Sequence, residues 1–236
     1  MLYIILSYIF SPLIFLLIAL KKNSSIKNIL VIQTAKIGDL ICSTPLLREI
    51  KTRYPNALLK VMINPITKDL LEHNPHVDKI IPINKDDYNG LSGKLRLSNL
   101  IRKENFDVSI FLNPNVPFLV ASFWGLVPVR LTIIPNFCTS TFKFASFFVT
   151  NFEKHLAGRK VLETSLKLLE KIDIKNPSIS KEVYKSQKSD EIAQKIIGDI
   201  KKPLIGIAIT SGKKLKEMGP FKVAEIVNQI LSKMDI

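Results

Sequence analysis

The stretch that decides the fold is residues 28–64, NILVIQTAKIGDLICSTPLLREIKTRYPNALLKVMIN. An apolar run at 28–33 is followed by helical spacing over 40–53 and by a second apolar run at 57–64. Short apolar runs that alternate with amphipathic helices are typical of βα units around a parallel sheet. The same alternation predicts further strands at 78–83, 106–112 and 129–134 and further helices at 66–73 and 91–104. The apolar run 117–124 fits a buried helix or a strand, because periodicity does not separate the two.

The remainder of the chain predicts the end of one domain and the start of another. Residues 153–172 carry an apolar stripe with helical spacing and predict a long helix that closes the first domain. The polar, proline-containing stretch that follows predicts a linker. After it we expect a helix at 189–200, a buried strand at 203–210 and a helix at 221–234. The predicted organisation is a Rossmann-like parallel-sheet domain at 28–173, a linker at 174–188 and an incomplete second Rossmann-like domain at 189–236.

The first 20 residues contain no charged side chain and are long enough to span a bilayer as a helix. We therefore expect a membrane anchor at 1–20. A cleaved signal peptide fits less well, because Lys21, Lys22 and Lys27 follow the apolar run and none precedes it. These lysines predict that the globular part faces the cytoplasm, at the inner membrane. Pro12 leaves a second arrangement open, a kinked helix that lies in one leaflet.

The composition excludes several classes of protein. The chain has 236 residues, a formal net charge of +14 and 47% hydrophobic residues, so it is not a disordered chain. The positive charge suits an anionic membrane surface. It is scattered, with no basic helix interleaved with aromatic residues, so we expect no nucleic-acid partner. Cys42 and Cys138 have no CxxC neighbours, which excludes a disulfide framework and a Cys-rich zinc site.

The first strand runs into Gly38 and Asp39, where an open parallel sheet usually binds its ligand. Gly38 permits a tight turn or a close approach of the backbone to a ligand. Asp39 would sit at or just before the start of the next helix, either as a simple N-cap or with its carboxylate in the crevice. A single glycine does not form a GxGxxG fingerprint, so a nicotinamide cofactor is not expected.

A second loop, TSGKKLKEMGP at 210–220, offers hydroxyls, a glycine and lysines, which suit phosphate oxygens or a solvated turn equally well. Its spacing departs from Walker A, which disfavours an ATP-dependent enzyme that uses Lys213. Glu72, His73 and His76 surround Pro75, which breaks a helical metal-binding face, so a surface loop is expected there. His155 is expected in the first turn of the 153–172 helix, with no nucleophile to pair with.

Several motifs together resemble one family, the heptosyltransferase-type bacterial glycosyltransferases of family nine. They are Gly38-Asp39, Thr44-Pro45, Tyr54-Pro55 and Asn74-Pro75 with Asp78, in the family's order and spacing. GLVPVRLTI at 125–133 and KEMGPFKVAEIV at 216–227 resemble two further segments, with Met218 where the family has an aromatic residue. The resemblance covers about 28–236.

The resemblance implies a GT-B fold, in which the N-terminal sheet holds the acceptor and the C-terminal sheet holds a nucleotide-sugar, here expected to be ADP-heptose. It implies inverting sugar transfer to a lipid-linked or lipopolysaccharide-type glycan, without a metal or another cofactor. Asp39 matches the family's proposed base, with Lys36 and Gly38 as substrate-binding positions beside it. Thr210, Ser211 and Lys216 match positions that contact donor phosphates.

The sequence departs from the family pattern at its C-terminal end. An acidic residue for the donor and a Gly-rich, His-containing nucleotide segment are not found within 1–236. We therefore expect either a piece of a longer glycosyltransferase or, as the alternative, a truncated, non-catalytic remnant that binds glycans. The sequence leaves the sugar, the nucleotide, the acceptor and the oligomeric state open.

Overall fold

The computed structural model describes residues 2–21, 25–198, 204–211 and 214–233. By its internal contacts the chain divides into two units, Met1–Tyr184 and Lys185–Ile236. The division falls inside the predicted linker of 174–188. The assignment of the two units to an acceptor and a donor remains a prediction.

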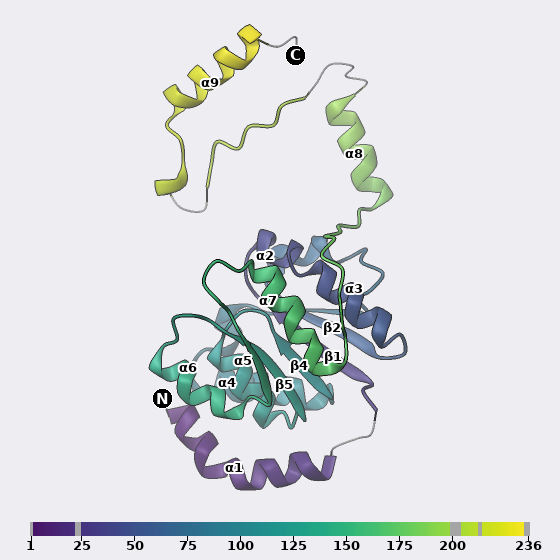
Figure 1. Ribbon diagram of the computed structural model, residues 1–236, viewed down its shortest axis with the longest axis vertical. Coiled ribbons are helices and arrows are strands. Elements are labelled where there is room, and N and C mark those ends of the chain that lie inside the picture. Colours follow the sequence, from purple (N-terminus) through teal and green to yellow (C-terminus); the bar gives the residue numbers. More distant parts are fainter. Residues whose placement is uncertain (1, 22–24, 199–203, 212–213, 234–236) are drawn as a thin grey trace. The chain divides into compact units, whose positions relative to one another are not determined.

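The first unit is built on a six-stranded parallel sheet with the strand order β3-β2-β1-β4-β5-β6 (Figure 1). This confirms the predicted α/β class and parallel sheet, and the five predicted strands are β1 to β5. The strands are β1 (Asn28–Gln33), β2 (Leu58–Ile63), β3 (Lys79–Pro82), β4 (Val108–Phe111), β5 (Val129–Ile134) and β6 (Asn151–Lys154).

Helices cover both faces of this sheet. They are α1 (Leu2–Lys21), α2 (Ile37–Ile41), α3 (Thr44–Arg53), α4 (Gly90–Lys103), α5 (Val116–Trp124), α6 (Ser140–Ala145) and α7 (Val161–Leu168). Short 3-10 helices are η1 (Pro65–Leu70), η2 (Lys85–Tyr88), η3 (Ser146–Phe148) and η4 (Leu169–Ile172). The 117–124 run is therefore a helix, and the predicted 66–73 helix is largely the 3-10 helix η1.

The alternation of side chains along β1 explains the two hydrophobic layers. Leu30 and Ile32 pack with α1, α4 and α5, whereas Ile29 and Val31 pack with α3 and α7 on the other face. All four side chains are fully buried. A strand that is apolar on both faces belongs to a parallel sheet covered by helices on both sides, as Figure 1 shows.

The predicted 153–172 helix is wrong over residues 153–160. Residues 151–154 form β6, which pairs in parallel with β5, and α7 begins only at Val161. Gly158 has φ +83° in the connection between them, a conformation that ends a regular element and favours glycine. The apolar stripe itself is real, because Leu166 and Leu169 are buried against the sheet.

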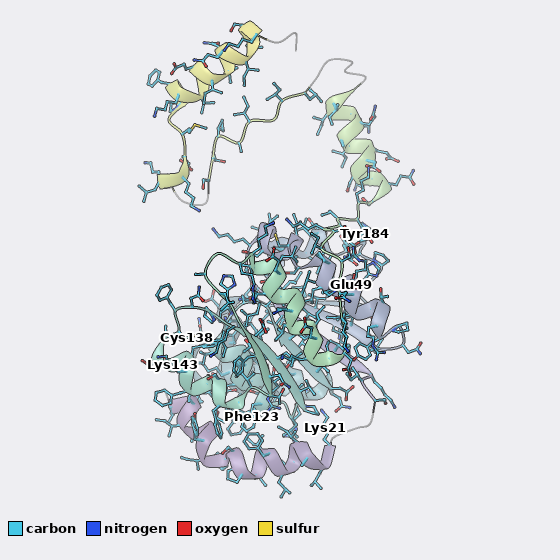
Figure 2. The ribbon with its side chains drawn as sticks, in the orientation of Figure 1. Lys21, Glu49, Phe123, Cys138, Lys143 and Tyr184 are labelled. Carbon is cyan, nitrogen blue, oxygen red and sulfur yellow. The ribbon has the colours of Figure 1, made fainter. Side chains whose placement is uncertain are left out.

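The apolar N-terminal segment forms one helix, α1, that is long and apolar enough to cross a membrane by length and composition. Within the first unit it also packs on the protein. The Tyr3 hydroxyl lies 2.7 Å from Ser98 Oγ on α4, and Trp124 Nε1 donates to Ser7 Oγ at 2.8 Å. Phe15 contacts Phe123 of α5, with ring centroids 5.0 Å apart. Figure 2 labels Phe123, which lies next to α1.

The second unit contains α8 (Gln187–Ile197), the 3-10 helix η5 (Lys214–Lys216) and α9 (Pro220–Lys233). The buried strand predicted at 203–210 is wrong over the described residues 204–210, which pair with no strand and are exposed. Ile207, at the centre of the run, is 43% exposed. A strand is stable only when its main-chain groups pair with a neighbour, and the described part of this unit offers none.

Candidate functional site

A cavity of about 540 Å³ opens at the carboxyl edge of the sheet. It lies where β1 and β4 are neighbours, the point at which the strand order reverses direction. Three residues at these strand ends line the cavity: Gln33, which ends β1, and Leu112 and Asn113, which follow β4. Ligands of open parallel sheets bind at this switch point. The fold therefore places the main candidate site at the first βα turn, where the sequence analysis expected it.

Gln33 and Ser43 fix the turn that follows β1. The buried Gln33 amide donates to Ser43 Oγ at 2.9 Å, and Ser43 Oγ donates to the main-chain carbonyl of Asp39 at 2.8 Å. A buried polar group is stable only with such partners. This chain of hydrogen bonds holds the short helix α2 against the end of the strand, and so sets the position of Asp39.

Asp39 lines the cavity and its side chain is exposed at the rim. It is the third residue of α2, and its Oδ2 accepts a hydrogen bond from the Lys36 main-chain N–H at 3.3 Å. Lys36 is the N-cap residue, so the expectation that Asp39 is itself a simple N-cap is wrong. The carboxylate interacts with the start of the helix and also lines the cavity.

Gly38 does not form the tight turn that the sequence allowed, since it lies inside α2 and its φ is not positive. A Cβ built on Gly38 meets no heavy atom within 4 Å. The open space beside Gly38 is compatible with the other role expected from the sequence, a close approach of the backbone to a ligand. Gly38 and the exposed Lys36 lie beside Asp39 but not among the residues that line the cavity.

The structure adds residues that the sequence analysis missed. Asn113 bridges the strand ends, because its side chain accepts from Thr34 N–H and donates to Thr34 Oγ1, both at 3.2 Å. Lys160 and Lys181 supply two cationic side chains to the cavity lining. Asn113 could have been found from the sequence, because it is a polar residue directly after the predicted strand 106–112. The two lysines lie far along the chain in irregular segments, and no local pattern marks them.

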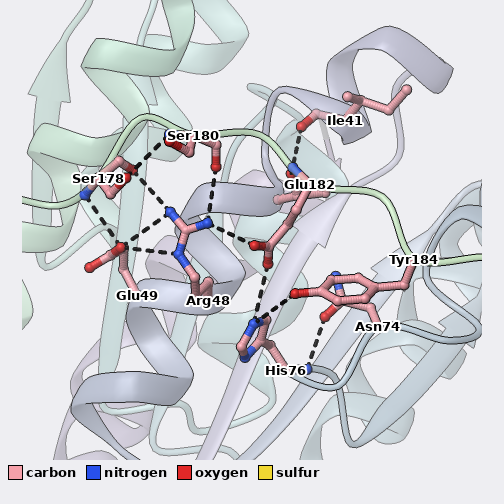
Figure 3. Close-up of polar contacts among 10 residues, drawn as sticks. Ile41, Arg48, Glu49, Asn74, His76, Ser178, Ser180, Glu182 and Tyr184 are labelled. Atoms are coloured by element: carbon pink, nitrogen blue, oxygen red, sulfur yellow. Dashed lines mark hydrogen bonds and ion pairs between the residues drawn. The ribbon is translucent and has the colours of Figure 1, made fainter.

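The wall that carries Lys181 is formed by a strap, residues 174–184, which runs over α3 (Figure 3). Arg48 of α3 donates to Glu182 Oε2 at 2.7 Å and to the Ser180 carbonyl at 3.0 Å. His76 Nε2 lies 3.2 Å from Glu182 Oε1 on the other side. The strap is thus tied to the first unit over a segment that was predicted to be part of a linker.

The predicted donor residues Thr210, Ser211 and Lys216 all lie in the second unit and are exposed. The Ser211 main-chain N–H donates to Glu217 Oε1 at 3.1 Å. Lys216 ends η5. Lys213, the residue of the disfavoured phosphate-enzyme reading, lies outside the described residues. These residues belong to a different unit from Asp39, and their role stays a prediction.

Two further sequence expectations have clear structural outcomes. His155 is not in a helix: it follows β6, and its Nδ1 lies 2.9 Å from Thr164 Oγ1. His76 belongs to the contacts of the strap, as described above. Across the described ranges no group of three or more His, Cys, Asp or Glu side chains is placed to hold a metal ion.

Arg130, from the motif at 125–133, serves the fold. It is 2% exposed, and its guanidinium donates to the main-chain carbonyls of Phe148, Val127 and Pro128. Burial lowers its pKa to about 10. These bonds join the start of β5 to η3 and give Arg130 no place in the cavity lining.

Two curated proteins are similar in sequence to part of this chain. The chain is 30% identical over 106 residues to lipopolysaccharide heptosyltransferase 2 of Salmonella typhimurium and 29% identical over 104 residues to the Escherichia coli protein of that name. Each match covers 44% of this chain. Over these residues the chain is similar to lipopolysaccharide heptosyltransferases. No family model matches it, but the resemblance to family nine that the motifs indicated is confirmed.

Solved structures extend the likeness to the fold of most of the chain. A glycosyltransferase of family 9 from Veillonella parvula matches with a TM-score of 0.68 at 21% identity. The match covers 89% of this chain and 67% of the Veillonella chain. E. coli ADP-heptose LPS heptosyltransferase II has a TM-score of 0.66 at 18% identity, covering 88% and 62%. These confirm the predicted GT-B-type fold class. The match spans only 30% of the length of the curated relatives.

Proposed function

We propose that this chain belongs to a glycosyltransferase of lipopolysaccharide-type glycan synthesis and that its first unit forms the acceptor side. The observation that carries the proposal is the cavity at the switch point of the sheet, with the Asp39 carboxylate at its rim. The likeness to heptosyltransferases supports a heptose as the transferred sugar and ADP-heptose as the donor. The acceptor is a lipid-linked or lipopolysaccharide-type glycan at the cytoplasmic face of the inner membrane.

The proposed reaction is an inverting transfer without a metal or other cofactor. The acceptor hydroxyl oxygen attacks the anomeric carbon, the bond from that carbon to the phosphate oxygen breaks, and the nucleoside diphosphate leaves. Asp39 takes the proton of the hydroxyl as the new bond forms. Lys36 and Gly38 bind the acceptor beside it, and Thr210, Ser211 and Lys216 hold the donor phosphates. Fixed hydrogen-bond donors there would stabilise the charge on the leaving diphosphate.

The walls of the cavity support an anionic acceptor. Lys160 and Lys181 line it together with a single carboxylate, that of Asp39. Lysine side chains bind phosphate and carboxylate groups through charge. A glycan that carries acidic groups would therefore enter with its charges at these lysines and a neutral hydroxyl left for Asp39.

The test is sugar transfer from ADP-heptose to a membrane glycolipid acceptor by the chain and by any longer protein that contains it. Asp39→Asn keeps an oxygen that accepts from the Lys36 N–H, so α2 stays folded while the base is lost. We expect its rate to fall by at least about 100-fold. The matched control is Asp69→Asn, at an exposed aspartate of η1 outside the cavity lining, with an unchanged rate.

The variant Gly38→Ala distinguishes an effect on acceptor binding from an effect on stability. Because the new Cβ meets nothing within 4 Å, the variant should be as stable as the wild type but bind the acceptor more weakly. Wild-type activity in Asp39→Asn would refute the assignment of the base. Acceptor binding without transfer, by the chain and by any longer protein that contains it, would instead favour the glycan-binding remnant.

A further inference from the structure

The helix α1 has two unlike faces. Five of its side chains are buried against α4, α5 and their neighbours, and they are Tyr3, Ile4, Ser7, Ile14 and Ile18. The other face is open to the outside. Its members lie three or four residues apart, are all apolar and are between 51% and 76% exposed: Leu2, Ile5, Ile9, Leu13, Leu16 and Leu20. A stripe of this kind on a surface helix marks a binding face.

The open face continues onto neighbouring elements. Phe144 of α6 and Phe147 of η3 are 52% and 54% exposed. The Tyr8 hydroxyl donates to the Phe144 carbonyl at 2.8 Å, and the Tyr8 ring lies 5.1 Å from that of Phe147. The aromatic side chains of α6 and η3 therefore border the exposed stripe of α1 and widen one apolar surface.

The buried face argues against a helix that leaves the domain to span a bilayer. Trp124 would lose its hydrogen bond to Ser7, and Phe123 would lose the ring of Phe15. At the far end of the helix, Lys21 Nζ donates to the carbonyls of Phe106 and Leu126. A spanning α1 would expose the apolar face of α5, whereas a helix that stays on the domain keeps these contacts.

We propose that α1 lies flat in one leaflet of a lipid bilayer, still packed on the domain, with its exposed stripe among the acyl chains. This arrangement satisfies both faces of the helix at once. A bend part-way along α1, which contains Pro12, lets it follow the curved surface of the domain (Figure 1). The inference specifies the membrane partner in the proposed function and does not depend on sugar transfer.

Charge complementarity identifies the partner as an anionic lipid surface. Lys21 ends the helix, where its ammonium group, bonded to the two domain carbonyls, interacts with the charges of Asp107 and of Arg102 on α4. Lys94 lines a cavity of about 420 Å³ together with Leu2 at the other end of α1. Cations that flank an apolar stripe at both ends suit the headgroups around an embedded helix, where each contributes to binding of anionic lipids.

Depth measurements distinguish a flat helix from a spanning one. In the whole chain with Cys42→Ser and Cys138→Ser, nitroxides are placed on Ile5→Cys, Leu13→Cys and Leu20→Cys, and vesicles of phosphatidylethanolamine and phosphatidylglycerol are added. A flat helix gives all three labels one shallow depth, about 5–10 Å below the headgroups. A spanning helix places the central label about 12 Å deeper than the first, since eight residues rise by that length. That second result would overturn the proposal.

Binding measurements test the stripe itself. The double variant Ile9→Gln with Leu16→Gln should bind these vesicles at least about 30-fold more weakly, because two large apolar side chains no longer enter the bilayer. The matched controls Leu58→Gln and Ile66→Gln replace residues that are 48% and 74% exposed on β2 and η1. They should bind within about twofold of the wild type.

Trp124 fluorescence, unchanged in every variant, would show that α1 still packs on the domain, because Trp124 donates to Ser7. The proposal is overturned if the double variant binds as tightly as the wild type. It is also overturned if the wild-type chain does not bind vesicles and instead dimerises through the stripe. No sugar donor is present in these experiments, so a failure here leaves the sugar-transfer proposal to its own test.

Discussion

Arg48 is the main attachment of the strap, residues 174–184, to the first unit. Its guanidinium contacts four oxygen groups: Glu182 Oε2 at 2.7 Å, the Ser180 carbonyl at 3.0 Å, and the Ser178 carbonyl and Glu49 Oε1 at 3.4 Å (Figure 3). Only Glu49 lies outside the strap. We predict that Arg48→Ala releases the strap from α3 while the sheet stays folded.

The magnitude follows from these contacts. A charge-assisted hydrogen bond contributes about 1.5–3 kcal/mol when buried. The Arg48 and Glu182 side chains are 21% and 18% exposed, so solvent weakens their pair, and the longer contacts add less. We take about 2 kcal/mol for the whole attachment, which corresponds to about a 30-fold larger population of the open strap.

Limited trypsin digestion measures that population. All three lysine side chains are exposed, but Lys181 lies within the strap, whose main-chain carbonyls are held by Arg48, whereas Lys185 and Lys188 lie beyond it. Cleavage at a site that must first open tracks the population of the open form. The rate at Lys181 relative to Lys185 should rise by about 30-fold in Arg48→Ala. The same ratio of cleavage rates in Arg48→Lys should lie between those of Arg48→Ala and the wild type, because an ammonium group does not reproduce the forked hydrogen bonds of the guanidinium.

Arg102→Ala is the control, since Arg102 is an exposed arginine of α4 outside the strap contacts. It should leave the ratio of cleavage rates unchanged. Trp124, the one tryptophan of the chain, reports unfolding of the first unit by fluorescence. If Arg48→Ala leaves cleavage at Lys181 as slow as in the wild type, the strap is held by something other than Arg48. If the variant instead unfolds the whole unit, the strap is not a separate element.

Three further predictions concern stability. Hydrogen bonds from Lys60 and then Lys79 hold the pKa of Glu104 below its ordinary value, so Glu104→Gln should cost about 1 kcal/mol in urea unfolding above about pH 5. That difference should shrink as the pH falls through the lowered pKa, because protonated Glu104 then resembles glutamine. Phe123→Ala should cost about 3–5 kcal/mol, whereas Phe137→Ala, at a 95% exposed ring, should cost almost nothing. Amide exchange in detergent should be faster in α8 and α9, which bury no side chain, than in the sheet; equal protection would contradict this.

The sequence predicted most of the sheet, for a physical reason that β1 illustrates. A strand buried on both faces is apolar along its covered length, and β1 shows this as the unbroken apolar run 29–32 between Asn28 and Gln33. β6 escaped prediction because it is an edge strand without an apolar run, whereas β3, at the other edge, keeps the apolar pair Ile80 and Ile81. Asn151, Phe152 and Lys154 are exposed, so the segment lacks the apolar pattern that marks a covered strand.

The candidate site was predictable in one part only. Gly38 and Asp39 follow directly after the first strand, and the rule that ligands bind at the carboxyl edge places them at the site. The sequence predicts Gln33 only as the last residue of a strand, because no local pattern reveals its hydrogen bond to Ser43. Lys160 and Lys181 reach the cavity through tertiary packing, which no local pattern encodes.

The failed prediction at 203–210 shows where a local pattern ceases to determine structure. PLIGIAIT has the composition of a buried strand, as β1 does, yet its described residues 204–210 are exposed. The difference is the partners. β1 pairs with β2 and β4 in parallel over most of its length, so every apolar side chain has a covered face to enter. The described part of the second unit supplies no such neighbour. An apolar run is therefore necessary for a central strand but not sufficient, and parallel neighbours would have to pair with 204–210 to turn this segment into one.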